Sequence, residues 1–276
     1  MKLFLKMKVP VSNLVPVLKW AGGKRWLAAQ YQNIFPTGYD RLVEPFAGSA
    51  AVFFSFRPRN AWLNDVNVEL MNTYQAISND WESVLKALRQ HQKNHSAKYY
   101  YEVRESTPRL EKSRAAKFIY LNRTCFNGLY RVNLKGKFNV PIGTKSTVLL
   151  PSDDFQAVGK LLKNTKLTSL DFESVIDNTG PKDFLFVDPP YTVRHNLNGF
   201  IKYNEKLFSW SDQIRLRDSV FRASARGVKI LMSNADHQSI RDLYADCSNM
   251  MIATRQSVMA AQSENRKVTT ELLINI

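Results

Sequence analysis

The chain has 276 residues, 44% of them apolar, and carries a formal net charge of +15. This length allows a full hydrophobic core, either in one α/β domain with an insertion or in two small domains. The excess of positive charge argues against an enzyme that acts only on small anionic metabolites and favours a partner with many phosphates. Nucleic acid is therefore the first partner to consider.

The cysteines and the hydropathy pattern exclude several other classes. Cys125 and Cys247 belong to no Cys-x-x-Cys or Cys/His cluster, so neither a disulfide framework nor a zinc site is expected. Residues 1–13 contain lysines and no long apolar run, unlike a signal peptide. No stretch approaches the roughly 20 apolar residues of a membrane span. We therefore expect a cytoplasmic protein without a membrane partner or a bound metal.

Short apolar runs predict strands near residues 41, 60, 166, 183, 228 and 250 and at the C-terminus. Helical patterns separate most of them, at residues 48–56, 66–77, 211–226 and 236–246. This alternation predicts an α/β fold with a mostly parallel sheet covered on both faces. The last two strands lack a helix between them, so we expect them to form an antiparallel pair at one edge.

The alternation stops between residues 79 and 164. Helical patterns occur there at 80–92, 97–105 and 109–122, followed by "FNGLYRVNLKGKFNVPIG", whose Asn-Gly and Lys-Gly pairs suggest a β-hairpin. From Lys86 to Lys145 the chain has 14 Lys or Arg residues and three acidic residues. We expect a basic domain at 79–164, inserted into a sheet domain formed by 1–78 and 165–276.

Two acidic residues follow the first two predicted strands. In "LVEPFAGSAAVFF" Glu44 ends a strand, and Gly48 lies in the turn before a helix, where glycine lets the backbone approach a ligand. One such glycine is a weak signal, and taken alone an ordinary strand-to-helix turn explains it better. About 20 residues later "WLNDVN" places Asp65 at the next strand end, where an acid can accept ribose hydroxyls.

A Gly-Gly-Lys turn precedes these motifs in "KWAGGK", residues 19–24. It suggests a phosphate-binding loop, but the G-x-x-x-x-G-K-[ST] spacing is absent. A P-loop nucleotide hydrolase is therefore not expected.

The stretch "DFLFVDPPYTVRH" joins a buried strand to an acid, two prolines and an aromatic residue. The prolines must stop the sheet ladder after Val187, which holds Asp188 at the carboxyl end of the strand. Ligands of open α/β sheets bind at that edge, so the carboxylate is well placed for chemistry. The alternative is a plain Pro-Pro turn, capped by Asp188 and covered by Tyr191.

The motifs "VEPFAGS", "LND", "LDF" and "DPPY" in this order, preceded by "KWAGGK", resemble the Dam-type adenine-N6 DNA methyltransferases. The resemblance runs from about Leu18 to the C-terminus. It implies a seven-stranded, Rossmann-like methyltransferase sheet with an inserted helical and β-hairpin DNA-recognition domain. It also implies S-adenosylmethionine as the cofactor, no metal, and double-stranded DNA as the partner of a bacterial or phage-encoded enzyme. No amphipathic surplus demands a dimer, so we expect a monomer.

By this resemblance the cofactor-binding residues are Trp20, Lys24, Glu44, Phe46, Gly48, Ser49, Asp65, Asp171, Phe172 and Asp188. The loop from Glu44 to Ser49 would hold the methionine part of the cofactor, and Asp65 its ribose. Phe172 would stack beside the adenine, or it could equally be a core residue.

The resemblance makes Asp188, Pro189 and Tyr191 the catalytic residues. An exocyclic purine amine is a poor nucleophile because its lone pair is delocalised. The Asp188 carboxylate can accept one N–H of the amine and the Pro189 carbonyl the other, which favours attack on a methyl group. Tyr191 can stack on an adenine that has been flipped out of the duplex.

The expected DNA-binding residues are Arg123, Phe126, Asn127, Arg131, Asn133, Lys135 and Lys137. By the resemblance, Phe126 and Asn127 would fill the space left by the flipped base, and Arg131 would recognise a guanine through its O6 and N7. Arg131 could instead bind a phosphate, as expected for Lys135 and Lys137. After "FNVPIG" the chain has "TKSTVLLP", without the basic and aromatic residues of the GATC-specific enzymes, so GATC is not assumed.

Two other functions remain open from the sequence: methylation of adenine N6 in RNA, and nucleic-acid binding without catalysis on the same scaffold. A cytosine-C5 enzyme is disfavoured because it needs a thiol after a proline. Cys125 follows Thr124 and Cys247 follows Asp246.

Overall fold

The computed structural model of the chain describes residues 14–133, 136–192, 208–247, 249–256 and 268–276. These residues contain a seven-stranded sheet with the strand order β3-β2-β1-β4-β5-β7-β6. The strands are β1 (Arg41–Glu44), β2 (Ala61–Asn64), β3 (Thr165–Thr168), β4 (Asp183–Val187), β5 (Lys229–Ala235), β6 (Asn249–Gln256) and β7 (Val268–Asn275). Neighbours among β1 to β5 pair in parallel, whereas β7 is antiparallel to β5 and β6. The expected sheet and its antiparallel edge pair are confirmed.

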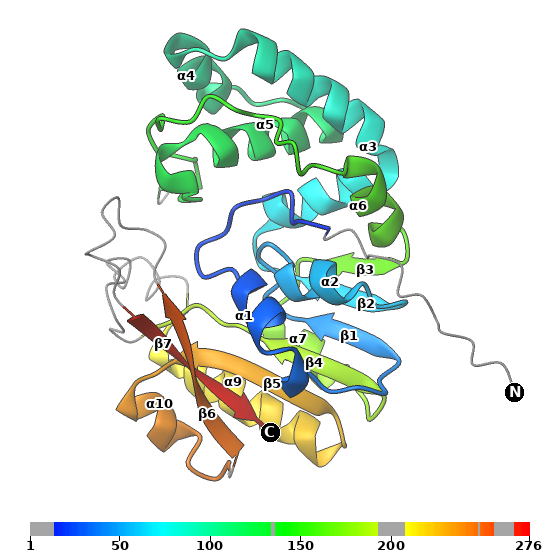
Figure 1. The fold of residues 1–276 in the computed structure, drawn as a ribbon, viewed down its shortest axis with the longest axis vertical. Coiled ribbons are helices and arrows are strands. Elements are labelled where there is room, and N and C mark those ends of the chain that lie inside the picture. Colours follow the sequence, from blue (N-terminus) through cyan, green and yellow to red (C-terminus); the bar gives the residue numbers. More distant parts are fainter. Residues whose placement is uncertain (1–13, 134–135, 193–207, 248, 257–267) are drawn as a thin grey trace, which may run out of the picture.

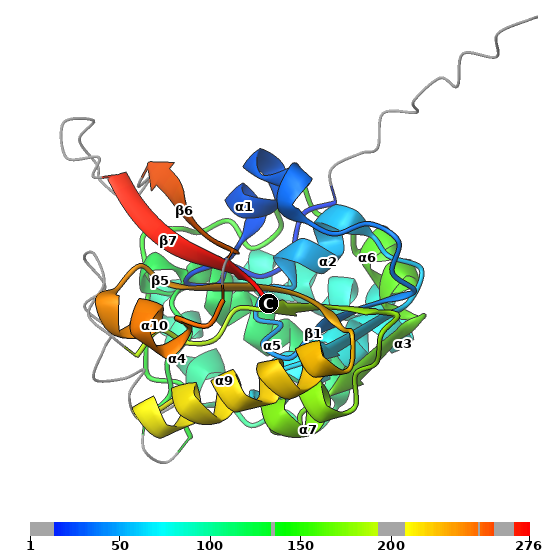
Figure 2. The same ribbon diagram turned by 90° about the horizontal axis from the view of Figure 1, so that it is seen from below.

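Alternating side chains of the strands build a core on each face of the sheet. In β4, Phe184 and Phe186 belong to one buried cluster, and Leu185 and Val187 belong to the other. One face is covered by α1 (Arg25–Gln30), α2 (Ala51–Phe56), α3 (Val68–Asn94) and α6 (Phe155–Leu162), while α5 (Glu111–Thr124) packs on α3 away from the strands (Figure 1). The other is covered by α7 (Phe172–Asp177), α9 (Trp210–Ala225) and α10 (Gln238–Leu243) (Figures 1 and 2). The sheet is thus sandwiched between helical layers.

The helical part of the insertion extends from one end of the molecule. The helices expected at 66–77 and 80–92 form one helix, α3, which is interrupted only by a non-helical Asp80. α3 leads away from the sheet to α4 (Ala97–Glu105) and α5 (Figure 1). Ile119 and Leu121 of α5 nevertheless belong to the same buried cluster as Leu42 of the sheet. The insertion therefore shares its core with the sheet.

The segment expected to be a regular β-hairpin has a looser structure in its described part. It begins with a short 3-10 helix, η2 (Phe126–Gly128). The other described 3-10 helix, η1 (Gln32–Ile34), lies elsewhere in the chain, between α1 and β1. Two isolated antiparallel bridges join the arms of the segment, Cys125 to Ile142 and Val132 to Phe138. Asn127 has a φ of +54°, and Pro141 lacks a donor, so a continuous ladder cannot run between the bridges. The chain reverses direction as expected, but its described part forms two isolated bridges in place of the two strands of a β-hairpin.

The sheet order creates a crevice between β1 and β4. After β1 the chain crosses one face through α2 to reach β2, and after β4 it crosses the other face through α9 to reach β5. The loops that follow β1 and β4 therefore diverge at the carboxyl edge of the sheet. Such a reversal of strand order is where open α/β sheets bind their ligands.

Among the described helices, none is both long enough and apolar enough to cross a membrane.

Candidate active site

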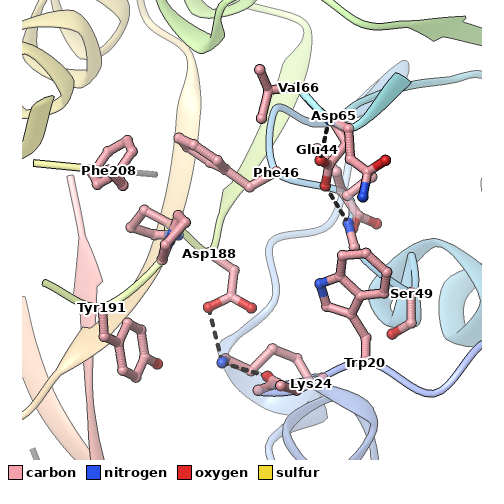
Figure 3. A pocket seen from close by; sticks show the side chains of 18 of the residues that line it. Trp20, Lys24, Glu44, Phe46, Ser49, Asp65, Val66, Asp188, Tyr191 and Phe208 are labelled. Carbon is pink, nitrogen blue, oxygen red and sulfur yellow. Dashed lines mark hydrogen bonds and ion pairs between the residues drawn. The ribbon is translucent and has the colours of Figure 1, made fainter. Parts of the chain in front are cut away.

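A cavity of about 830 Å³ opens at the carboxyl edge of the sheet. Its walls come from residues 20–24, from the loops that follow β1 to β4, from the start of α9, from β7 and from residues 129–132 of the insertion. This volume is typical of cofactor and substrate sites. Figure 3 shows Lys24 and Asp188 pointing toward one another in this cavity, with Tyr191 on one side and Trp20 on the other.

The loop after β1 can approach a ligand because of Gly48. Its φ is +49°, and a Cβ atom at this position would lie 2.7 Å from Cδ1 of Trp20. The buried Tyr74 donates a hydrogen bond of 2.9 Å from its hydroxyl to the Gly48 carbonyl. Only glycine satisfies both the backbone angle and the packing against Trp20. Trp20, Gly48 and Ser49, three of the expected cofactor-binding residues, all line the cavity.

Glu44, at the end of β1, is almost completely buried, with 2% of its surface exposed. Its Oε1 accepts a hydrogen bond of 2.7 Å from the backbone N–H of Phe53. Burial raises the pKa of Glu44 to about 8, although the Phe53 N–H opposes the shift, and the nearby Asp188 raises the pKa further. Glu44 is therefore mostly protonated at neutral pH and can both donate and accept a hydrogen bond.

Asp65 joins the loops that follow β1 and β2. Its Oδ2 accepts a hydrogen bond of 3.0 Å from the Gly48 N–H, and its Oδ1 accepts one of 2.9 Å from the Asn67 N–H. Burial raises the pKa of Asp65, and these two bonds lower it in part. Each carboxylate oxygen keeps a further acceptor position, so Asp65 can still accept hydroxyl groups.

Asp171 and Phe172 lie at the start of α7 and line the same cavity. Phe172 is 6% exposed and belongs to the buried cluster under α9, so the core alternative describes its packing. Phe46 packs beside it at a ring distance of 5.4 Å, and the Arg215 guanidinium lies 4.3 Å from its ring centre. The Asp171 carboxylate caps α7 and pairs with Arg215.

Lys24 is buried against the acid that follows β4. Its Nζ lies 2.9 Å from Oδ1 of Asp188 and 3.2 Å from Oε2 of Glu271, and it donates to the Gly22 carbonyl at 2.7 Å. Burial alone would lower the pKa of Lys24, but its acidic neighbours, Asp188 foremost, raise it well above its usual value. Lys24 is thus a permanent cation beside Asp188, while its side chain also borders the cavity.

Asp188 is held by its neighbours and remains open to the cavity, with 20% of its side chain exposed. Besides Lys24, the hydroxyl of Ser233 donates a hydrogen bond of 2.7 Å to its Oδ1. Burial raises the pKa of Asp188, Glu271 adds to this effect, and Lys24 and Ser233 oppose it. The carboxylate therefore holds a proton more tightly than an ordinary aspartate, which makes it a better acceptor for an N–H group.

Pro189 and Tyr191 also line the cavity, directly after Asp188. The Lys24 ammonium lies 5.2 Å from the centre of the Tyr191 ring. A cation at this distance is attracted to the ring face and helps to fix its orientation. The structure thus brings all three expected catalytic residues to one wall of the cavity.

Sequence reasoning missed several residues of this site. Ser233 lies in β5 and Glu271 in β7, and Val66 and Leu170 line the cavity with 76% and 45% of their surfaces exposed. A glutamate inside the apolar run "TTELLINI" was the signal that could have identified Glu271.

Neither a metal centre nor a reactive thiol is evident in the described part of the chain. It contains no group of three or more His, Cys, Asp or Glu residues that could hold a metal ion. Cys125 is buried, and burial raises the pKa of its thiol to about 11, the opposite of what a nucleophilic cysteine requires.

The comparison with known proteins agrees with this geometry. Residues 20–259 match the D12 class N6 adenine-specific DNA methyltransferases. The chain belongs to this family.

Several relatives are similar along most of the chain. The type II methyltransferase M1.LlaDCHI of Lactococcus lactis subsp. cremoris is 36% identical over 284 residues, which cover 99% of this chain and 98% of that protein. The type II methyltransferase M.MjaIII of Methanocaldococcus jannaschii is 34% identical and covers 80% of this chain and 84% of its own length. The DNA N-6-adenine-methyltransferase of Escherichia phage P1 is 35% identical over 93% of this chain and 35% of its own length.

The structure corrects one residue of the expected DNA-binding surface of this D12 methyltransferase. Arg123 is 1% exposed, and its guanidinium forms two bonds to the Asp153 carboxylate at 2.6 and 2.7 Å. It also donates to the carbonyls of Val17 and Val148. Arg123 therefore ties three chain segments together inside the protein and has no free donor for a phosphate.

The other expected recognition residues lie in the loose segment after α5. Phe126 is 52% exposed, Asn127 is also exposed, and Arg131 lines the cavity and donates to the Asn139 side chain at 2.9 Å. Asn133 and Lys137 are exposed and form the turn, in which Asn133 Oδ1 accepts a bond of 3.0 Å from the Lys137 N–H. Lys135 lies outside the described residues.

The loop of residues 19–24 contacts both α5 and the segment of residues 126–143, hereafter the recognition segment. The Trp20 and Tyr130 rings stack at 5.8 Å with an angle of 18°. The Asn122 side chain accepts from the Lys19 N–H at 2.9 Å and donates to the Lys19 carbonyl at 2.8 Å. The loop that packs on Gly48 is therefore fixed to the region expected to bind DNA.

Proposed function

We propose that this D12 methyltransferase transfers a methyl group from S-adenosylmethionine to the N6 amine of an adenine flipped out of double-stranded DNA. One observation carries the proposal. A single cavity is bordered by the Gly48–Asp65 loops, by the Asp188 carboxylate and by Arg131. A methyl donor, an acceptor amine and the recognised DNA can therefore meet within one chain.

The residues present fit S-adenosylmethionine. Gly48 lets the Trp20 ring pack directly on the loop after β1 at the wall of the cavity, and the Asp65 carboxylate keeps acceptor positions for ribose hydroxyls. Val66 and Leu170 offer exposed apolar surface at the ends of β2 and β3, which suits a purine ring. The bound cofactor supplies an electrophilic methyl group on a sulfonium, which leaves as a neutral thioether when the methyl bonds to nitrogen.

The chain's own residues prepare the amine. Asp188 accepts one N–H and the Pro189 carbonyl accepts the other, which draws the lone pair out of the purine ring. The nitrogen gains the methyl group and gives up one proton. Asp188 can accept this proton, because its pKa is raised above that of an ordinary aspartate. Tyr191 stacks on the flipped base, a contact worth about 1–3 kcal/mol. No covalent intermediate with the enzyme is needed.

Recognition is assigned to residues 79–164, of which Arg131 is the proposed DNA-binding residue that lines the cavity. The strong positive charge of residues 86–145 favours a nucleic acid as the substrate. One chain supplies every residue that the proposed reaction requires, so no second copy is needed, and DNA as the substrate is consistent with a cytoplasmic enzyme.

The test is incubation of the purified protein with unmethylated plasmid DNA and S-adenosylmethionine that carries an isotope-labelled methyl group. Mass spectrometry of the nucleosides should find the label in N6-methyladenine, and sequencing should place it in a short repeated context. Label in structured RNA but not in duplex DNA would instead assign the RNA reaction. Binding of DNA without any label in either polymer would contradict the proposal.

A further inference from the structure

Two residues from strands beyond β4 converge on the Asp188–Lys24 pair. Ser233 of β5 is fully buried, and Glu271 of β7 is 13% exposed. β5 and β7 are antiparallel neighbours, with Ser233 opposite Leu273 and Ala235 opposite Glu271. Strand pairing thus brings both side chains to the edge at which Asp188 ends β4.

Ser233 and Lys24 make the two oxygens of the Asp188 carboxylate inequivalent. Both side chains meet the same oxygen, Oδ1, at 2.7 and 2.9 Å. Two donors on one oxygen fix the plane of the carboxylate and satisfy its two lone pairs. Oδ2 is the oxygen that remains for a substrate N–H.

Glu271 completes the surroundings of the Lys24 ammonium. This group has three N–H donors, and three oxygens surround it: the Gly22 carbonyl, Asp188 Oδ1 and Glu271 Oε2. The Glu271 carboxylate thus holds the ammonium from the side of β7, in addition to its contacts with Gly22 and with Oδ1 of Asp188. Glu271 also shares the positive charge that would otherwise fall on Asp188 alone.

We infer that Ser233 and Glu271 are positioning residues for methyl transfer, which hold Asp188 and Lys24 so that Oδ2 of Asp188 faces the substrate amine. The inference rests on the proposed function and adds two residues that touch neither substrate nor cofactor in it. The two residues have different tasks. Ser233 orients the Asp188 carboxylate, and Glu271 weakens the attraction between Lys24 and that carboxylate by pairing with Lys24 itself.

The test compares Ser233→Ala and Glu271→Gln with matched changes elsewhere. Ser219→Ala is the control for the first, because Ser219 is also fully buried and donates to the Arg215 carbonyl at 2.8 Å in α9. Glu173→Gln is the control for the second, because Glu173 of α7 is also a carboxylate in ion pairs, here with Arg215 and Arg222 of α9. For each protein one measures the single-turnover rate on duplex DNA and the dissociation constants of S-adenosylmethionine and DNA.

Ser233→Ala should lower the single-turnover rate by about 10- to 100-fold, the value of one hydrogen bond to a charged group, with both dissociation constants nearly unchanged. The two control variants should retain the wild-type rate. A rate unchanged in Ser233→Ala, or a rate that falls only in proportion to cofactor binding and thermal stability, would overturn the positioning role.

Glu271→Gln adds a readout that packing alone would not change. The charged and titratable groups that face Asp188 are Lys24, Glu44, Tyr191 and Glu271. Since Glu271 raises the pKa of Asp188, its replacement should move the acidic limb of the single-turnover pH profile to lower pH and reduce the maximal rate. An acidic limb at the wild-type pH would contradict the inference for Glu271.

These outcomes are distinguishable from failure of the proposed function. If the wild-type protein transfers no methyl group to DNA, the proposed function itself fails. If the wild type is active and both variants match it in rate and pH profile, only the positioning inference fails.

Discussion

The sheet edge and the recognition segment differ in how firmly they are built before any ligand binds. At the sheet edge, Lys24, Glu44 and Asp188 are buried or nearly so and each is held by short polar contacts. In the recognition segment, two isolated bridges join the arms, and Phe126 and Asn127 are exposed. Chemistry requires acceptors that are oriented in advance, whereas a surface that enters DNA must leave its donors and rings free for the partner.

The largest expected effect is the loss of methyl transfer when the carboxylate at the sheet edge is replaced. Asp188→Asn should lower the single-turnover methyl-transfer rate by at least about a thousandfold, because an amide is a weaker acceptor and cannot take the proton. DNA binding, measured by fluorescence anisotropy, should change little. Asp183→Asn is the control, since Asp183 begins the same strand at its opposite end and pairs with Arg41. Equal rates for the two variants would remove Asp188 from the chemistry.

Arg123→Ala tests whether this arginine belongs to the framework or to the DNA-binding surface. Removal of a buried, multiply bonded guanidinium should lower the free energy of unfolding by about 3–5 kcal/mol, because Asp153 is left buried and unpaired. Urea denaturation measures this loss. Normal stability together with weak DNA binding would restore Arg123 to the DNA-binding surface.

Gly48→Ala should weaken S-adenosylmethionine binding by at least about tenfold, since the new Cβ atom displaces Trp20 and closes the approach to the loop. Isothermal titration calorimetry measures the change. Gly38→Ala is the matched control: its φ is also positive, at +69°, but a Cβ there meets only the flexible end of Lys229, at 3.8 Å. Equal cofactor affinity in the two variants would show that Trp20 does not define the site.

Arg131→Ala should affect specificity rather than chemistry. We expect a loss of about 1–3 kcal/mol of discrimination at one base position, with methyl transfer retained at altered sites. Competition binding with a set of single-substitution duplexes measures it. A uniform loss of affinity across all duplexes would make Arg131 a phosphate contact.

Two groups, Glu44 at the sheet edge and His91 in α3, should lose their contributions to stability at opposite ends of the pH range. Glu44 at the sheet edge has a pKa of about 8 in place of 4.5, so its contribution to stability is fully present below pH 4.5 and is lost as the pH rises through 8. Glu44→Gln should remove this alkaline loss from a plot of Tm against pH. Parallel curves for variant and wild type would contradict the shifted pKa.

His91 of α3, which contacts Tyr99 of α4 and Tyr120 of α5, should change stability at the acidic end. Burial lowers its pKa from 6.5 to about 4, so its contribution is present above pH 6.5 and is lost as the pH falls toward 4. His91→Gln should flatten the acidic part of the Tm curve. Its alkaline part should stay as in the wild type.

The sheet edge could be predicted from the sequence because local rules determine it. The two prolines after Val187 had to end β4 and expose Asp188, whereas the glycine before α2 became informative only through its place in the order of the motifs. Such rules need only neighbouring residues. The positions of Asp188, Tyr191, Gly48 and Asp65 along one cavity followed from the parallel order of the strands.

The remaining features depend on contacts that no local pattern reveals. Arg123 is one of many basic residues in its region, and only the fold shows that Asp153 and the Val17 carbonyl surround it. Ser233 and Glu271 reach Asp188 through strands that lie 45 and 83 residues later in the chain. The sequence predicted separate helices at 66–77 and 80–92, yet α3 continues through both, past the non-helical Asp80.

The most direct test of the account maps N6-methyladenine on one unmethylated plasmid after reaction with the wild type, Asp188→Asn and Arg131→Ala, using labelled S-adenosylmethionine. The wild type should place label at one short repeated sequence, Asp188→Asn should place none while still binding the DNA, and Arg131→Ala should spread label over related sequences. Label placed by Asp188→Asn at the wild-type rate and positions would contradict the claim that the sheet edge performs methyl transfer through this carboxylate.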